Sequence, residues 1–305
     1  MSILLPITRA LASNYVHREL LNFVHSAFPI PSKLLRCGTP MRHWLIILRP
    51  LDWWPMLGFV IWGVVMPKDP SWQFQPILAV LALNAVYLSH AYGINLCAES
   101  NQNYPLSTWL GLGVLGLTVI FLSWLWQPVM GLSFLVGTVA SFAYSVDPVH
   151  LKSRPFLGVM TNALIFAPLS FSGYLAQRPF EPTASQITLF SSLILIPIQL
   201  LHEVDHILAD KAIGAQTTAV YLGPRRTIYL ALFGLIPATG SAWILGHSTQ
   251  TPLLEITLIW SIAVGLVSLR YRQHDLTLSR RPGLKQSIRY LSLIYGVIVA
   301  AIFLR

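Results

Sequence analysis

Nine long apolar runs dominate this sequence, and they leave the chain few ways to fold. Each run is close to the roughly 20 residues that a helix needs to cross the hydrocarbon core of a bilayer. Only 10% of the residues are charged and 54% are hydrophobic, whereas a soluble globular chain carries about 25% charged residues. The runs cover residues 44–66, 74–98, 108–126, 129–144, 156–176, 185–201, 227–246, 253–269 and 288–304.

The apolar runs predict an all-α, polytopic membrane protein. In lipid the backbone must satisfy its own hydrogen bonds, which helices achieve within one segment. We therefore expect about nine transmembrane helices around a central cavity, formed by a single domain over residues 44–305. Residues 1–43 form a basic N-terminal segment, expected to be a surface helix or a targeting segment.

The basic residues predict how the chain is oriented. The net charge is +9, but the Lys and Arg residues punctuate apolar runs and do not gather on one water-facing surface, so we expect no nucleic-acid partner. With nine spans, all of them except Lys68, Arg178 and Arg305 fall on one side. The positive-inside rule makes that side cytoplasmic, or its equivalent in an organelle, and places the N-terminus there. The membrane would be a bacterial inner membrane or an organellar one.

Acidic residues gather at the ends of two runs on the same predicted side, against the trend of the bases. Glu99 ends the second run, and Glu203, Asp205 and Asp210 follow the sixth. Ionisable residues at membrane depth are costly and are candidates for function. Asn95 lies one helical turn before Glu99, on the same face.

The spacing after the sixth run predicts a metal site rich in oxygen ligands. At 100° per residue, Glu203, His206 and Asp210 share an arc of about 60°, whereas Asp205 points away from it. Carboxylates with few nitrogen ligands suit Mg²⁺, which binds through one or two carboxylates plus substrate phosphates. Lys152 and Arg154, after the fourth run, could hold phosphate oxygens or could simply determine topology.

Several motifs in the chain resemble those of the UbiA-type membrane prenyltransferase family. The stretch from His202 to Gly223 is similar to the second Asp-rich motif of that family, and Asn95 with Glu99 is similar to the first. Supporting matches are Arg49-Pro50 and the segment from Tyr144-Ser145 to Leu151-Lys152-Ser153-Arg154-Pro155. This sequence has Glu99 and His206 where the family usually has Asp.

The resemblance implies an integral-membrane enzyme that transfers an isoprenoid chain from a prenyl diphosphate to an acceptor, expected to be an apolar aromatic molecule. It implies Mg²⁺ as the cofactor, with the donor chain lying among membrane lipid and apolar helices. The implied catalytic residues are Asn95, Glu99, Glu203 and Asp210. The implied diphosphate-binding residues are Lys152, Arg154, Tyr144 and Arg49. The implied metal ligands are Glu99, Glu203, Asp205, His206 and Asp210.

Two alternatives stay open at this point. The segment from His202 to His206 spells H-E-x-x-H, the helical motif of zinc proteases, in which Glu203 would be the general base. The chain could also be a non-catalytic relative that binds a lipid or a quinone.

Overall fold

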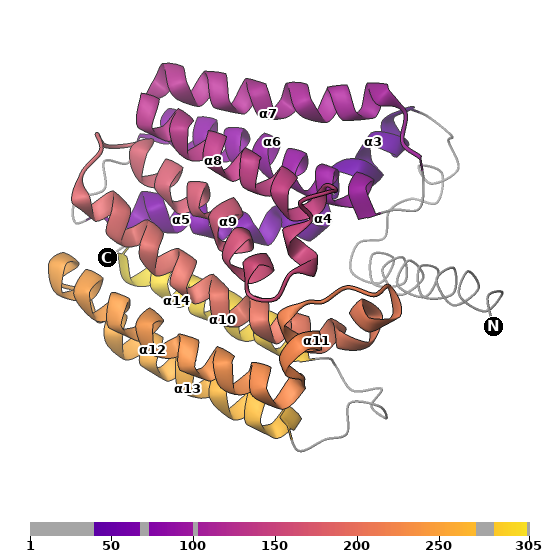
Figure 1. Cartoon of the computed structure of the whole chain (residues 1–305). Coiled ribbons are helices and arrows are strands. Elements are labelled where there is room, and N and C mark those ends of the chain that lie inside the picture. The colour runs from indigo at the N-terminus through magenta and orange to yellow at the C-terminus, as the bar shows by residue number, and fades with distance from the viewer. Residues whose placement is uncertain (1–39, 68–72, 100–102, 273–283, 304–305) are drawn as a thin grey trace, which may run out of the picture.

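The structure, a computed structural model, describes residues 40–67, 73–99, 103–272 and 284–303, and its regular structure there is entirely helical. Figure 1 shows the long helices lying alongside one another, with the short α11 at one end of the bundle. The elements are α3 (Pro40–Leu48), α4 (Pro50–Trp53), η1 (Trp54–Met56), α5 (Leu57–Val65), α6 (Phe74–Glu99), α7 (Leu106–Trp126), α8 (Pro128–Ser145), η2 (Leu151–Ser153), α9 (Leu157–Leu175), α10 (Pro182–Ala212), α11 (Thr218–Leu222), α12 (Pro224–Thr249), α13 (Leu253–Arg272) and α14 (Leu284–Phe303).

The all-helical membrane fold is confirmed, but the count of nine spans is not. Within the described residues, seven helices are long and apolar enough to cross a membrane, namely α6 to α10, α12 and α13. The apolar part of α14 covers only Tyr290–Ile302, and that of the first expected span covers only Trp54–Val65. Both are shorter than the roughly 20 residues that a spanning helix needs.

The first expected span is broken where Arg49 meets Pro50. Arg49 adopts a left-handed conformation with φ of 48°, and Pro50 then starts α4. A second proline, Pro55, lies in the 3-10 turn η1. Proline lacks the N–H that a continuous helix requires, so the run divides into α3, α4, η1 and α5.

The sixth span is longer than the apolar run that predicted it. Helix α10 continues eleven residues past Leu201, to Ala212, and has 31 residues in all. At 1.5 Å per residue it is about 46 Å long, against roughly 30 Å for the hydrocarbon core. Glu203 and Asp210 therefore belong to a regular helix, on the part that exceeds the apolar run.

Helices α9 and α10 form the centre of the bundle, and α5 crosses α9 at very close range. Helix α9 is the most buried of the seven candidate spans, and it packs against α5, α8 and α10. A Cβ atom on Gly63 would lie 2.0 Å from the Ser170 carbonyl oxygen, and one on Gly173 would lie 2.1 Å from that of Val60. Only glycine permits this approach of two backbones, a device common between membrane helices.

The expectation for residues 1–43 lies almost entirely outside the described residues. The structure describes this part of the chain only from Pro40, where α3 begins.

One continuous cluster of buried side chains includes residues from Trp53 to Val299. This core holds in place the helices that carry the predicted site.

Candidate active site

Two carboxylates lie on one face of α10, near its C-terminal end. Glu203 and Asp210 are seven residues apart, which is two helical turns, and their exposed fractions are 5% and 9%. They lie beyond Pro197, the proline inside this helix. The structure thus buries the pair that the spacing placed on a common arc.

The end of α6 brings a third carboxylate to the site. Asn95 Nδ2 donates to Glu99 Oε1 at 2.7 Å and to the Ser145 hydroxyl of α8 at 3.2 Å. Lys152 Nζ donates to the same Glu99 oxygen at 2.5 Å. Glu99, Asn95 and Lys152, which the sequence assigned to one site, are therefore in direct contact. Glu99, Glu203 and Asp210 are called the acid cluster below.

Lys152 lies on a constrained loop between α8 and α9. Two non-glycine residues of this loop, His150 and Phe156, have φ of 38° and 63°. Such left-handed conformations cost about 1–3 kcal/mol each and persist only where their surroundings impose them. Gly158 lets α9 approach the turn, since a Cβ atom there would lie 3.1 Å from the Lys152 carbonyl oxygen. The backbone itself thus directs Lys152 toward Glu99.

The connection from α10 to α11 folds back over the two acids of α10. Gly214, with φ of 76°, allows the chain to reverse. Thr217 Oγ1 then donates to Asp210 Oδ2, and the Ala219 amide donates to Glu203 Oε2, both at 3.2 Å. Buried carboxylates need such donors. The reversal therefore makes burial of both acids possible.

Electrostatic interactions join the parts of the site. Tyr144 of α8 interacts with Glu99, Glu203 and Asp210. Asp210 is stabilised by Lys152 and repelled by Glu99, and Glu203 is repelled by Asp210. Three carboxylates and one ammonium have a formal net charge of −2 when every acid is ionised. The site is therefore matched to a multivalent cation.

The remaining predicted site residues lie farther from the acid cluster or at its edge. Asp205 is exposed, as its angle on the helix predicted. His206 is half-buried, with its ring 4.6 Å from that of His202 between centroids. Arg154 is exposed, and in the described part of the chain it forms no ion pair with these acids. Arg49 pairs with Asp52 through its Nε atom at 2.5 Å.

Comparison with known proteins decides the family. The model of the UbiA prenyltransferase family matches residues 101–294, which is more than half of the chain. The chain belongs to the UbiA prenyltransferase family. The match contains the loop with Lys152 and the acids of α10, but it begins after Glu99.

Two curated relatives of the chain are named for different molecules. The chain is 27% identical over 209 residues to a lycopene elongase/hydratase of Haloarcula japonica, covering 63% of this chain and 70% of that protein. It is 28% identical over 138 residues to a homogentisate geranylgeranyltransferase of Hordeum vulgare, covering 42% of this chain and 33% of that one. The chain thus spans only about a third of the second relative.

Solved structures of UbiA homologues share the fold. A homologue from Archaeoglobus fulgidus superposes with a TM-score of 0.66 at 18% identity, covering 84% of this chain and 98% of that one. The same homologue bound to DMAPP and Mg²⁺ gives a TM-score of 0.61. Membership in this family removes the basis for interpreting the H-E-x-x-H segment as a protease motif.

The residues of the acid cluster would fit a magnesium ion that is also bound by a further ligand. Among the described residues, no three His, Cys, Asp or Glu side chains are grouped to hold a metal on their own. Glu203 and Asp210 are about 10 Å apart along the α10 axis, so an extended ligand is needed to bridge them. Magnesium commonly uses one or two carboxylates together with substrate phosphates.

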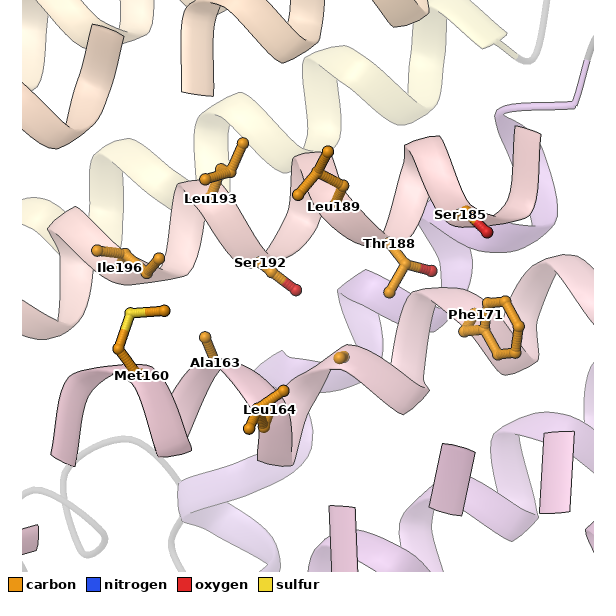
Figure 2. Close-up of a pocket in the computed structure, with 11 residues that line it drawn as sticks. Met160, Ala163, Leu164, Phe171, Ser185, Thr188, Leu189, Ser192, Leu193 and Ile196 are labelled. Carbon is orange, nitrogen blue, oxygen red and sulfur yellow. The ribbon is translucent and has the colours of Figure 1, made fainter. Parts of the chain in front are cut away.

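A separate groove runs along the outer seam of α9 and α10, away from the acid cluster. It has a volume of about 460 Å³ and is lined mainly by apolar side chains. Figure 2 shows it extending from Met160 and Ile196 to Phe171 and Ser185, toward the end of α10 opposite the acids. The groove therefore lies apart from the acid cluster.

Sequence reasoning missed the residues that support the acid cluster. Thr217 and Ala219 donate to the acids, and Thr218 Oγ1 accepts a hydrogen bond from the Phe156 amide at 3.0 Å. The run of small and polar residues after Gly214 was the available signal, because it follows two acids that would need donors. Nothing in the spacing indicated the contact between Phe156 and Thr218, which are 62 residues apart.

Proposed function

We propose that the chain is an integral-membrane prenyltransferase that transfers an isoprenoid chain from a prenyl diphosphate to an apolar, aromatic acceptor, with Mg²⁺ as cofactor. The observation that carries the proposal is the convergence of the acid cluster, Lys152 and Tyr144 at one end of a bundle of apolar helices. Carboxylates suit a cation that accompanies phosphates, and an ammonium suits the phosphate oxygens themselves. The proposal treats residues 44–305 as one catalytic domain.

The polar residues would act on the diphosphate. The Lys152 ammonium donates to phosphate oxygens, and the Tyr144 hydroxyl donates to an oxygen of the leaving group. Glu203 and Asp210 hold the cation that accompanies the diphosphate, and Asn95 orients Glu99. Mg²⁺, when bound, neutralises the charge that develops on the departing diphosphate.

The apolar helices would act on the isoprenoid chain. The bond between C1 of the donor and the bridging oxygen breaks, and the electron pair leaves with the diphosphate. A carbon of the acceptor forms the new bond to C1 and loses a proton. Helices that exclude water protect the allylic cation from hydrolysis before the acceptor reacts.

A second acceptor class is supported by the relatives. The Hordeum vulgare protein is named for homogentisate, an aromatic ring, whereas the Haloarcula japonica protein is named for lycopene, an acyclic polyene. The latter match covers more of this chain. A polyene is therefore the alternative to an aromatic acceptor.

The distribution of charge supports a cytoplasmic position for the site. Lys152 lies at the acid end of the bundle, and Lys211, Arg225 and Arg226 follow the acids of α10 closely, whereas Arg178 follows the other end of α9. By the positive-inside rule we propose that the acid cluster faces the cytoplasm or its organellar equivalent. Labelling of a cysteine introduced at the exposed Gln216 with a membrane-impermeant reagent, in sealed vesicles of known orientation, tests this sidedness. Labelling from the opposite side would contradict it.

The activity is tested by product analysis. Purified protein in lipid nanodiscs is incubated with geranyl or geranylgeranyl diphosphate, Mg²⁺, and either homogentisate or lycopene, and the products are identified by mass spectrometry. We expect a prenylated product and released diphosphate. Tight binding of the donor without any release of diphosphate would instead indicate the non-catalytic lipid or quinone binder.

A further inference from the structure

An amide pair bridges α9 and α10 one helical turn below the acids. Asn162 Nδ2 donates to Gln199 Oε1 at 2.7 Å, and both side chains are half-buried. Gln199 precedes Glu203 by four residues, so it lies about 6 Å deeper along the axis. The two residues belong to helices that are candidate membrane spans.

The pair faces the same side of α10 as the acids. At 100° per residue, Gln199, Glu203 and Asp210 fall within an arc of about 40°. On α9, Asn162 shares a face with Phe166, whose ring contacts that of Tyr92 on α6 at 6.3 Å between centroids. Tyr92 lies two turns before Glu99 on one face of α6. The amide pair and this aromatic contact thus form the next layer beneath the acid cluster.

The amide pair leaves one hydrogen-bond acceptor and one donor available. Within the described residues, the Asn162 Oδ1 acceptor and the Gln199 Nε2 donor have no hydrogen-bond partner. Polar atoms at membrane depth are costly when unpaired and are usually functional. One acceptor and one donor, on two side chains that are hydrogen-bonded to each other, match an oxygen that both donates and accepts.

We propose that Asn162 and Gln199 bind the polar group of the acceptor, and that the acceptor class is a hydroxylated ring rather than an unsubstituted polyene. A phenolic hydroxyl donates to Asn162 Oδ1 and accepts from Gln199 Nε2, while Tyr92 and Phe166 border the ring. The hydroxyl also directs electron density to the neighbouring ring carbon, which attacks C1 of the donor. This inference rests on the proposed function and specifies its substrate.

The test separates acceptor binding from donor binding. Asn162→Leu and Gln199→Met keep the shape of each side chain and remove its polar atoms, and Ser192→Ala, in the α9–α10 groove, is the matched control. With geranylgeranyl diphosphate and homogentisate, we expect each site variant to raise the KM for homogentisate about tenfold, the effect of losing one or two hydrogen bonds. The KM for the donor should stay within twofold, and Ser192→Ala should behave as wild type.

Two further measurements distinguish a specific loss of acceptor binding from a general disturbance of helix packing. Calorimetric affinity for geranylgeranyl diphosphate without acceptor reports whether each variant retains its donor site. The double exchange Asn162→Gln with Gln199→Asn keeps both amides and should recover part of the homogentisate KM.

The possible failures are distinguishable. An unchanged homogentisate KM in both single variants, or turnover of lycopene but not of homogentisate by the wild-type protein, would overturn the inference and leave the prenyltransferase proposal standing. An absence of product with both acceptors would instead count against the proposed function itself.

Discussion

Lys152 and Glu99 form an ion pair at 2.5 Å that joins the loop between α8 and α9 to the end of α6. Asn95 donates to the same carboxylate oxygen, so Glu99 is held from two sides. An incoming diphosphate would offer Lys152 several phosphate oxygens in place of one carboxylate oxygen. If the proposed function holds, this pair is the contact that donor binding would have to rearrange.

Lys152→Ala should weaken donor binding specifically. Loss of a charge-assisted hydrogen bond predicts an increase of roughly 10- to 100-fold in the KM for the prenyl diphosphate, with a much smaller change for the acceptor. Steady-state kinetics with each substrate varied in turn measures both constants. The control is Lys211→Ala, which removes an exposed lysine in the last turn of α10. If both variants changed the KM for the prenyl diphosphate equally, Lys152 would have no specific part in donor binding and would only determine topology.

Glu203→Gln and Asp210→Asn should each lower kcat strongly without unfolding the protein. Both substitutions keep the hydrogen-bonding shape and remove a negative charge from the cation site, which we expect to cost about 10²- to 10³-fold in kcat. Turnover and the thermal unfolding temperature in detergent are measured together. Glu255→Gln, an exposed acid in the first turn of α13, serves as the charge-matched control. Turnover near the wild-type rate in both site variants would refute the assignment.

Substitutions of Asp205 and of Asp210 should have very different effects on kcat. Asp205 is exposed, whereas Asp210 is buried and accepts a hydrogen bond from Thr217. We expect Asp205→Asn to keep kcat within about threefold of wild type, because exposed charges interact weakly through water. A loss as large as that in Asp210→Asn would show that Asp205 binds the cation after all, which would require α10 to rearrange on binding.

Removing divalent cations should lower the affinity for the donor as well as the rate. The acid cluster repels a diphosphate unless a cation intervenes, so chelation with EDTA should abolish calorimetric binding of geranyl diphosphate, and added Mg²⁺ should restore it. In Glu203→Gln, more Mg²⁺ should be needed for half-maximal binding. Binding that is equally tight in EDTA would rule out magnesium as the bridge.

The close crossing of α5 and α9 should not tolerate a larger residue in place of Gly63. Gly63→Val places a Cβ atom against a backbone oxygen of α9, and the helices have to separate, at a cost of about 3 kcal/mol or more in the free energy of unfolding. The unfolding temperature in detergent should fall clearly. Gly58→Ala on the same helix meets nothing within 4 Å and should be neutral or slightly stabilising.

The sequence predicted the helices well where one apolar run formed one helix. Runs 74–98 and 108–126 correspond closely to α6 and α7, because nothing inside them interrupts the backbone hydrogen bonds. The first run failed at Arg49-Pro50, where hydrophobicity alone does not reveal a left-handed residue. The last run corresponds to α14, but the apolar part of this helix is too short to place it among the candidate spans.

The candidate site was predictable to the extent that helical spacing determines it. A period of 3.6 residues placed Glu203 and Asp210 together and Asp205 apart, and the structure agrees. Contacts between segments distant in sequence could not be obtained this way. The contact of Lys152 with Glu99 depends on the path of a loop, and that of Asn162 with Gln199 depends on how two helices pack.

The hydrogen bond from the Phe156 amide to Thr218 links the two parts of the proposed donor site, the Lys152 loop and the segment that covers Asp210. Lys152 precedes Phe156 by four residues, and Thr217, which donates to Asp210, directly precedes Thr218. A phosphate that drew Lys152 inward would therefore also pull on the segment that covers Asp210. In the proposed donor site, gripping the anion and closing over the cation would then be one movement, which a ligand without a phosphate could not start.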